Sequence, residues 1–244
     1  MKELQFLPTL QLYTSQPTPC PYLKGRTWIT NFFVARTFPV ELYETLLSEK
    51  FRRSGTLFYK NTCKRCSSCI PLRIPVQEFR PSPSMKKCLR KNRDVTIEET
   101  SIQFDPQVSD LYRRYCNFKH GKEHTSEQED GFIRFLCTSP IETRMLRYLV
   151  RGNLIGASWI DILPRSFSSV YFAFDPAEAR RSLGTYSVLK EIELAKQAGK
   201  LYYHLGFYVP GSPKMEYKAR FKPHELLVSG VWQRGNGNIR AMEI

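Results

Sequence analysis

Three cysteines stand at a strict three-residue spacing in one short segment of the chain: Cys63, Cys66 and Cys69. Thiolates at this spacing can ligate zinc or an iron–sulfur cluster, and Cys20 is the best candidate for the fourth ligand. No second Cys-x-x-Cys or Cys/His pair completes a zinc knuckle, so reduced thiols packed around a tight loop are the alternative. We therefore expect these four cysteines either to bind a metal or to pack as free thiols.

Arg73 follows in the same segment and stands between Pro71 and Pro75 in an expected strand. A guanidinium that is fixed in this way suits bidentate recognition of a carboxylate, and a structural ion pair explains it equally well. Lys86 and Lys87 belong to the basic run that comes next. They could neutralise phosphates or a carboxylate, or they could form a solvated basic face.

Other side chains could take part in acyl transfer or in RNA binding. Asp161 ends an apolar strand, where a carboxylate can act as a general base or serve as a strand-end turn residue. Aromatic and basic side chains together can stack a terminal base and neutralise phosphates, although core packing and solvent exposure also explain them. The candidates for holding an RNA end are Arg90, Lys91, Tyr203, Tyr208, Lys214, Tyr217 and Lys218.

The net charge of the chain narrows the class of partner. The 244 residues include 37 Lys+Arg against 23 Asp+Glu, which gives a formal charge of +14. Such an excess favours nucleic acid first and an anionic membrane second. No apolar run approaches the roughly 20 residues that a membrane helix needs, and the N-terminus lacks the apolar core of a signal peptide. With seven cysteines, an odd number, we expect a cytoplasmic protein without a disulfide framework and without a membrane partner.

The spacing of apolar residues predicts the elements that position these side chains. The expected helices cover residues 40–51, 106–120, 132–136 and 185–198, with a polar stretch at 121–130. Two runs on either side of a Gly-Asn turn signal predict a hairpin. The expected strands cover residues 57–59, 72–76, 95–102, 144–150, 154–162, 168–174, 201–208 and 226–232.

The order of elements after residue 104 resembles the acetyltransferase-like (GNAT) fold. In that fold, the turn before the central helix has the form Arg/Gln-x-x-Gly-x-Gly/Ala, and its amides hold a pyrophosphate. This chain has Arg181 and Gly184 at the first two positions and Tyr186 at the last. A side chain of that size should obstruct a phosphate, so the resemblance implies an acyl-transfer scaffold with a spoiled coenzyme A loop. An ordinary strand-to-helix connection would account for the same residues.

Longer motifs resemble the arginyl/leucyl-tRNA–protein transferase family nearly from end to end, and most closely its bacterial aspartate/glutamate leucyltransferase branch. They include Cys20-Pro-Tyr-Leu-x-Gly-Arg, Phe51-Arg-Arg-Ser-Gly, Tyr59-x-x-x-Cys63-x-x-Cys66-x-x-Cys69-x-Pro-x-Arg73-Ile-Pro-Val, Ser168-Ser-Val-Tyr-Phe-x-Phe-Asp-Pro, Tyr202-Tyr-x-Leu-Gly and Lys214-Met-x-Tyr-Lys. The chain departs from the family's usual residues over 82–87 and at Ser212, where many members have a cysteine. We therefore expect no cysteine nucleophile at Ser212.

The resemblance implies an α+β protein with two parts. Residues 1–100 would form a smaller cysteine-bearing α/β region, and residues 101–244 an acetyltransferase-like domain that accepts aminoacyl-tRNA. The implied enzyme adds leucine from leucyl-tRNA to proteins with N-terminal Asp or Glu and marks them for degradation (the N-degron pathway). We expect direct transfer that requires no cofactor.

Within that reaction, Arg73, Lys86 and Lys87 would read the acceptor's carboxylate, and Asp161 would act as base or orient the amine. Three alternatives stay open. They are arginyl-tRNA as the donor, a non-catalytic RNA-binding protein with structural zinc, and an ordinary N-acetyltransferase.

Overall fold

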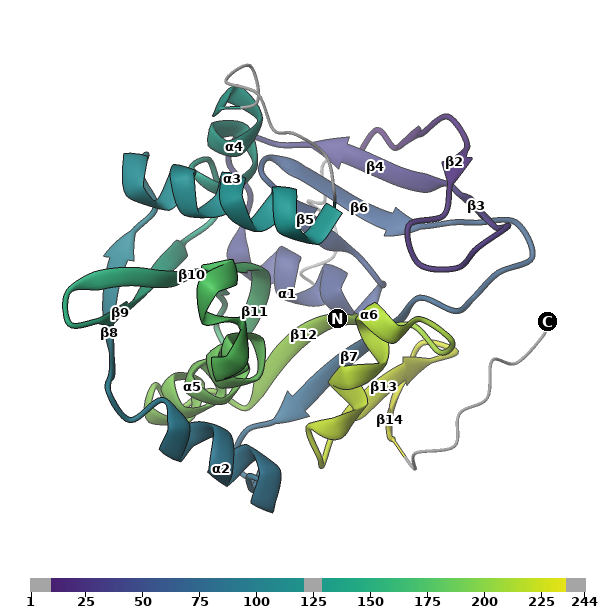
Figure 1. Cartoon of the computed structure of the whole chain (residues 1–244). Coiled ribbons are helices and arrows are strands. Elements are labelled where there is room, and N and C mark those ends of the chain that lie inside the picture. Colours follow the sequence, from purple (N-terminus) through teal and green to yellow (C-terminus); the bar gives the residue numbers. More distant parts are fainter. Residues whose placement is uncertain (1–9, 121–128, 236–244) are drawn as a thin grey trace.

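An eight-stranded sheet runs through the centre of the computed structural model, which describes residues 10–120 and 129–235 (Figure 1). Neighbouring strands are antiparallel except for β11 and β12, which are parallel. The strands in spatial order are β14 (Val231–Arg234), β13 (Glu225–Val228), β7 (Ile70–Pro75), β12 (Tyr202–Tyr208), β11 (Ser166–Phe174), β10 (Asn153–Ile162), β9 (Thr143–Val150) and β8 (Val95–Ser101).

A smaller four-stranded sheet belongs to the N-terminal part of the chain. Helix α1 (Val40–Ser48) packs with it around a core that includes Phe33, Tyr43 and Phe58, each at most 3% exposed. The strands in order are β1 (Tyr13–Thr14), β4 (Thr30–Val34), β6 (Leu57–Asn61) and β5 (Arg52–Ser54), and a separate pair is formed by β2 (Thr18–Pro19) and β3 (Thr27–Trp28).

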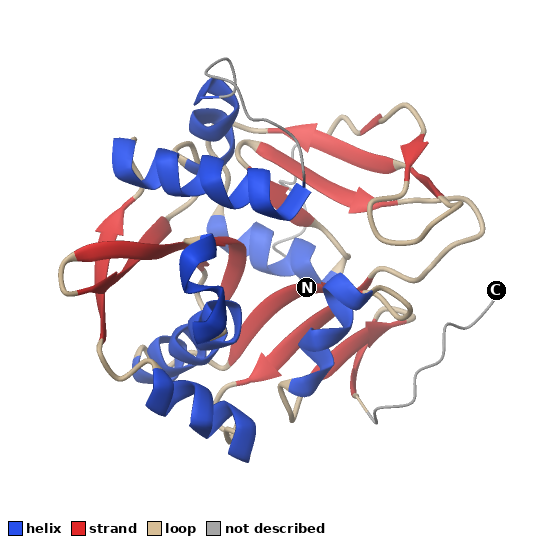
Figure 2. Ribbon diagram, in the orientation of Figure 1, coloured by secondary structure: helices blue, strands red, loops and turns tan. Residues whose placement is uncertain are grey.

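Helices cover both faces of the large sheet (Figure 2). The remaining helical segments are α2 (Pro83–Lys91), α3 (Pro106–His120), α4 (Glu129–Leu136), η3 (Pro176–Arg181), α5 (Leu183–Gln197), α6 (Pro213–Glu216) and η4 (Tyr217–Arg220). Consecutive residues of β9 point to opposite faces, so Leu146 joins the core under α2 and α5, while Met145 joins the core under α3 and α4. This mixed arrangement confirms the predicted α+β fold class.

Local sequence explains where several elements begin and end. Helix α2 starts where the Ser82 hydroxyl accepts the N–H of Met85 and proline occupies the first turn. Helix α5 stops just before Gly199, whose φ of +68° suits a residue without a side chain. The single strand predicted over 226–232 is instead the hairpin β13–β14, because Ser229 and Gly230 both have positive φ and form a two-residue turn.

The large sheet crosses the predicted boundary at residue 100. Strand β7 pairs with both β12 and β13, and β8 pairs with β9. The side chains of Leu72 and Ile74 are at most 1% exposed and belong to the same core as α5, which ties β7 to the C-terminal elements. Residues 121–128 of the expected polar stretch lie outside the described residues, and none of the helices described is long and apolar enough to cross a membrane.

Candidate active site

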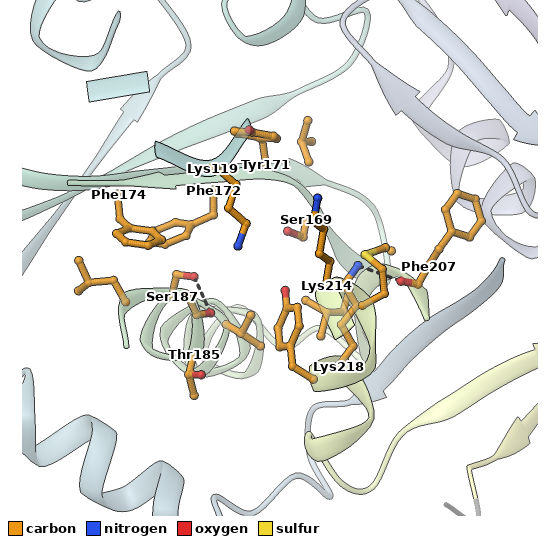
Figure 3. A pocket seen from close by; sticks show the side chains of 18 of the residues that line it. Lys119, Ser169, Tyr171, Phe172, Phe174, Thr185, Ser187, Phe207, Lys214 and Lys218 are labelled. Atoms are coloured by element: carbon orange, nitrogen blue, oxygen red, sulfur yellow. Dashed lines mark hydrogen bonds between the residues drawn. The ribbon is translucent and has the colours of Figure 1, made fainter. Parts of the chain in front are cut away.

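A pocket opens where β11 and β12 separate. The two strands pair only between Ser166–Ser168 and Tyr202–His204, although β11 continues to Phe174 and β12 to Tyr208. The pocket has a volume of about 560 Å³ and is lined by residues of β5, α3, β11, α5, β12, α6 and η4 (Figure 3). The N-terminal and C-terminal parts of the chain therefore both contribute to one cavity.

One wall of the pocket is aromatic. Phe172 and Phe174 are two residues apart on β11, and their ring centroids lie 6.0 Å apart at an interplanar angle of 24°. Tyr115 of α3 packs against Phe174, with 5.0 Å between the ring centroids. Figure 3 shows the two phenylalanine rings together, facing the start of α5. Such a wall can stack a base or hold an apolar side chain.

Basic side chains line much of the pocket outside its aromatic wall, and among the residues that the structure describes no Asp or Glu lines it. Lys119 of α3 and Lys214 of α6 are exposed and point into the pocket (Figure 3). Arg52 and Lys218 line its buried side, and each residue is 8% exposed. Uncompensated positive charge in a concave site favours anionic ligands.

Arg52 and Lys218 are each held by a backbone carbonyl of one of the diverging strands. The Nη2 of Arg52 donates to the carbonyl of Ser169 on β11 at 2.5 Å, and the Nζ of Lys218 donates to the carbonyl of Phe207 on β12 at 2.9 Å. Burial and the charge of Arg52 lower the pKa of Lys218 to about 7, while Cys69 acts in the opposite direction. Near neutral pH, this ammonium therefore loses its proton easily.

The start of α5 forms another side of the pocket. Gly184 and Thr185 line it, and a Cβ at Gly184 would meet no atom within 4 Å. Tyr186 is 5% exposed and packs edge-on against Tyr148 in the core, at 6.1 Å between ring centroids. Because successive residues of a helix point in different directions, Tyr186 faces away from the site. The expectation that Tyr186 obstructs this turn is wrong.

Three of the predicted RNA-binding residues line the pocket: Lys214, Tyr217 and Lys218. Burial raises the pKa of Tyr217 to about 12, so its hydroxyl remains a neutral hydrogen-bond donor. Tyr203 is instead fully buried, and its hydroxyl donates to the carboxylate of Glu191 at 2.5 Å. Tyr208 is half-buried at the end of β12 and is not among the lining residues.

The predicted basic residues of α2 lie outside the pocket. They are exposed on the surface of that helix, namely Lys86, Lys87, Arg90 and Lys91. The ammonium of Lys91 donates to the carbonyl of Arg180 in η3. Ala179 of η3 and Ser182, which follows η3, both line the pocket, so the C-terminal end of α2 lies beside the pocket's rim.

Asp161 has a structural position. Its side chain is 0% exposed and does not line the pocket. Its carboxylate accepts hydrogen bonds from Arg53 Nη2 at 2.5 Å, Arg53 Nε at 3.0 Å and the Thr143 hydroxyl at 2.7 Å. Burial alone would lower the pKa of the Arg53 guanidinium, but the charge and hydrogen bonds of the Asp161 carboxylate raise it by more, so the pKa is raised overall. The prediction of Asp161 as a general base is therefore wrong: this ion pair ties β5 to β10.

Arg73 also lies outside the pocket, in the middle of β7. The central carbon of its guanidinium is 3.6 Å from the ring centroid of Tyr202 and 4.2 Å from that of Trp232. Its Nε donates to Glu225 at 2.7 Å. These contacts join β7, β12, β13 and β14, which is the structural ion pair that the sequence offered as the alternative.

Four free, half-buried thiols gather in the N-terminal region: Cys20, Cys63, Cys66 and Cys69. Burial, followed by the charges of the other three thiols, raises the pKa of Cys69 to about 12. Cys20 and Cys63 each accept a backbone N–H at 3.4 Å. Within the described ranges, however, no group of three or more Cys, His, Asp or Glu side chains is arranged to hold a metal ion. Zinc or an iron–sulfur cluster at these cysteines stays a prediction of the sequence.

Several lining residues had not been predicted. Arg52 stands in the motif Phe51-Arg-Arg-Ser-Gly, so the sequence carried a signal for it, although not for its role. Phe172 and Phe174 likewise stand in the motif Ser168-Ser-Val-Tyr-Phe-x-Phe-Asp-Pro. Lys119 carried no such signal, because its approach to the pocket depends on how α3 packs against β11.

A mixed sheet with this strand order, covered by helices and opened between two parallel strands, has the architecture of the acetyltransferase-like (GNAT) fold. Models of the arginine-tRNA-protein transferase N terminus and C terminus match residues 18–87 and 107–228. The chain belongs to this family of aminoacyltransferases. Both matched regions supply residues to the pocket, including Arg52 from the first and Lys218 from the second.

Relatives of similar length support the same assignment. Proteins named aspartate/glutamate leucyltransferase from Ruegeria pomeroyi and Saccharophagus degradans are each 37% identical over 227 residues, which is 91% of this chain and 83% and 96% of theirs. The one from Pseudomonas fluorescens is 33% identical over 93% of this chain and 97% of its own. The match to the solved structure of FemX covers 71% of this chain and 61% of that chain at 7% identity and a TM-score of 0.48.

Proposed function

We propose that this protein transfers leucine from leucyl-tRNA to the α-amine of proteins that begin with Asp or Glu. The relatives named aspartate/glutamate leucyltransferase motivate the proposal. The observation that carries it is the pocket at the split between β11 and β12, which combines an aromatic wall with a buried cationic end. One cavity thus offers surfaces of opposite character to a donor and an acceptor.

The aromatic wall suits the 3′ end of the donor. Phe172 and Phe174 present a stacking surface for the terminal base, and Lys119 lies beside it for a phosphate. The exposed lysines of α2 continue the positive charge beyond the rim, where a longer part of the tRNA could bind.

The charge of the pocket favours a leucyl donor over an arginyl donor. Its described lining includes Arg52, Lys119, Lys214 and Lys218 but no carboxylate that could pair with an arginyl guanidinium. A leucyl side chain needs only apolar contact, which Leu183 and Val188 of α5 provide along with the phenylalanines.

The chemistry is direct transfer between an activated ester and an amine. The acceptor's α-nitrogen attacks the ester carbonyl, the new C–N bond forms, and the C–O bond to the ribose breaks. The proton that the amine loses is transferred to the departing ribose oxygen, which leaves as a hydroxyl group. An α-amine has an ordinary pKa of about 8, so a useful fraction is unprotonated near neutral pH. The neutral hydroxyl of Tyr217 can donate to the carbonyl oxygen as it gains negative charge.

The test offers the purified protein radiolabelled leucyl-tRNA or arginyl-tRNA together with peptides that begin with Asp, Glu, Lys or Ala. We expect label from leucyl-tRNA on the Asp and Glu peptides alone. Transfer from arginyl-tRNA only would overturn the donor assignment. Salt-sensitive RNA binding without any peptide labelling would instead support a non-catalytic RNA-binding protein.

A further inference from the structure

We propose that Arg52 and Lys218 form the subsite that binds the acidic side chain of the acceptor's first residue. The proposal rests on the proposed function, because it concerns how that reaction selects Asp and Glu. Arg52 and Lys218 thus take the role in binding the acceptor's carboxylate that the sequence predicted for Arg73, because Arg73 is held inside the sheet by Tyr202, Trp232 and Glu225.

The two cations converge on one small space beside Gly206. A Cβ built on Gly206 would lie 3.3 Å from Lys218 Nζ and 3.7 Å from Arg52 Nη2. Gly206 has a φ of +86° and lies where the pairing of β12 with β7 shifts register, so both the backbone and the space favour glycine. The absence of a side chain leaves the two nitrogens facing the pocket, which all three residues line.

The buried positive charge of this pair lacks a counter-ion. Both residues are 92% buried, and the hydrogen bonds they donate go to the neutral carbonyls of Ser169 and Phe207. Neither cation forms an ion pair with a carboxylate among the described residues. Two like charges held together away from water are unfavourable unless an anion joins them. The neighbouring Arg53 shows the contrast, because Asp161 neutralises it.

A carboxylate fits this place better than a phosphodiester. Lys119 and Lys214 are exposed to solvent and can bind a phosphate of a continuous RNA strand. The space at Gly206 is enclosed by Arg52 and Lys218 and suits a short group that ends in an anion. The side chain of an N-terminal Asp or Glu has this shape, and a guanidinium with an ammonium beside it provides several donors for its two oxygens.

The test compares two peptides that differ only in beginning with Asp or with Asn. Full-length Lys218→Met and Arg52→Met are measured beside wild type and Lys200→Met, a control whose ammonium also donates to backbone carbonyls but lies outside the pocket. We expect kcat/KM for the Asp peptide to fall about 30-fold or more in both pocket variants. The kcat/KM for the Asn peptide and the affinity for leucyl-tRNA should each change less than threefold, and Lys200→Met should resemble wild type in all three measurements.

A second measurement on wild type alone remains valid if the variants do not fold. Equilibrium binding of the two peptides is compared at pH 6 and pH 8.5, where their α-amines titrate alike. Burial and the charge of Arg52 lower the pKa of Lys218 to about 7, against the opposite effect of Cys69, so Lys218 loses its charge over this range. Binding of the Asp peptide should therefore weaken at least threefold more than binding of the Asn peptide.

The outcomes separate the two proposals. An unchanged Asp-to-Asn ratio in the folded variants, parallel binding at the two pH values, or an equal loss of leucyl-tRNA affinity would each overturn the subsite. A wild-type protein that binds the Asp peptide selectively but transfers no leucine would instead overturn the proposed function.

Discussion

The ion pair between Arg53 and Asp161 provides the sharpest test of the distinction between structural and catalytic carboxylates. Asp161→Asn would place its amide N–H₂ against one of the two Arg53 donors, Nε or Nη2, and would leave that guanidinium buried without a counter-charge. Since both side chains are at most 2% exposed, we expect a loss of about 3–5 kcal/mol in unfolding free energy. For a chain of this size, that corresponds to a Tm lower by roughly 6–20 °C.

The assay pairs urea and thermal unfolding with single-turnover leucine transfer, measured well below the variant's Tm. The folded variant should transfer leucine within about threefold of the wild-type rate, because Asp161 does not reach the pocket. The double variant Arg53→Met with Asp161→Leu, which removes both charges, should recover much of the lost stability. An unchanged Tm together with a 100-fold slower transfer would refute this reasoning and would restore Asp161 as a general base.

Three further predictions follow from charge and burial. Burial raises the pKa of Glu191 from 4.5 to about 7, so the contribution of Glu191 to stability is full below pH 4.5 and falls by up to about 3 kcal/mol as pH rises through 7. Relative to wild type, Glu191→Gln should lack this loss when urea unfolding is compared between pH 4.5 and pH 8, and an identical pH profile would contradict the prediction. Replacing the exposed Lys86 and Lys87 with Ala should leave Tm unchanged. It should also reduce the slope of log K for tRNA binding against log salt concentration by up to about one for each lysine, and an unchanged slope would show that α2 does not contact the tRNA. If the cysteines bind metal, elemental analysis should find zinc or iron that Cys66→Ser loses, and a metal-free active enzyme would end that prediction.

Much of the fold follows from local pattern, while the site depends on long-range partners. Apolar periodicity placed α1, α3 and α5, because each helix buries one regular face, and two nearly continuous apolar runs placed the hairpin β9–β10, whose strands are buried on both faces. Lys214, Tyr217 and Lys218 were found because cationic and aromatic residues are adjacent in the sequence. Asp161 was misassigned because its partner Arg53 is 108 positions away, and sequence alone does not show which buried carboxylate is neutralised.

The position of β7 also constrains how the chain folds during synthesis. Ile74 pairs with Tyr203 on one side, and Leu72 pairs with Leu226 on the other, so both edges of an early strand await partners made much later. At typical translation speeds, the chain between Ile74 and Tyr203 takes on the order of ten seconds to appear. Until then, an apolar strand remains open on both sides, and such long-range pairing is slow to form. The strand that unites the two parts of the enzyme is therefore also a segment exposed to aggregation before the sheet closes.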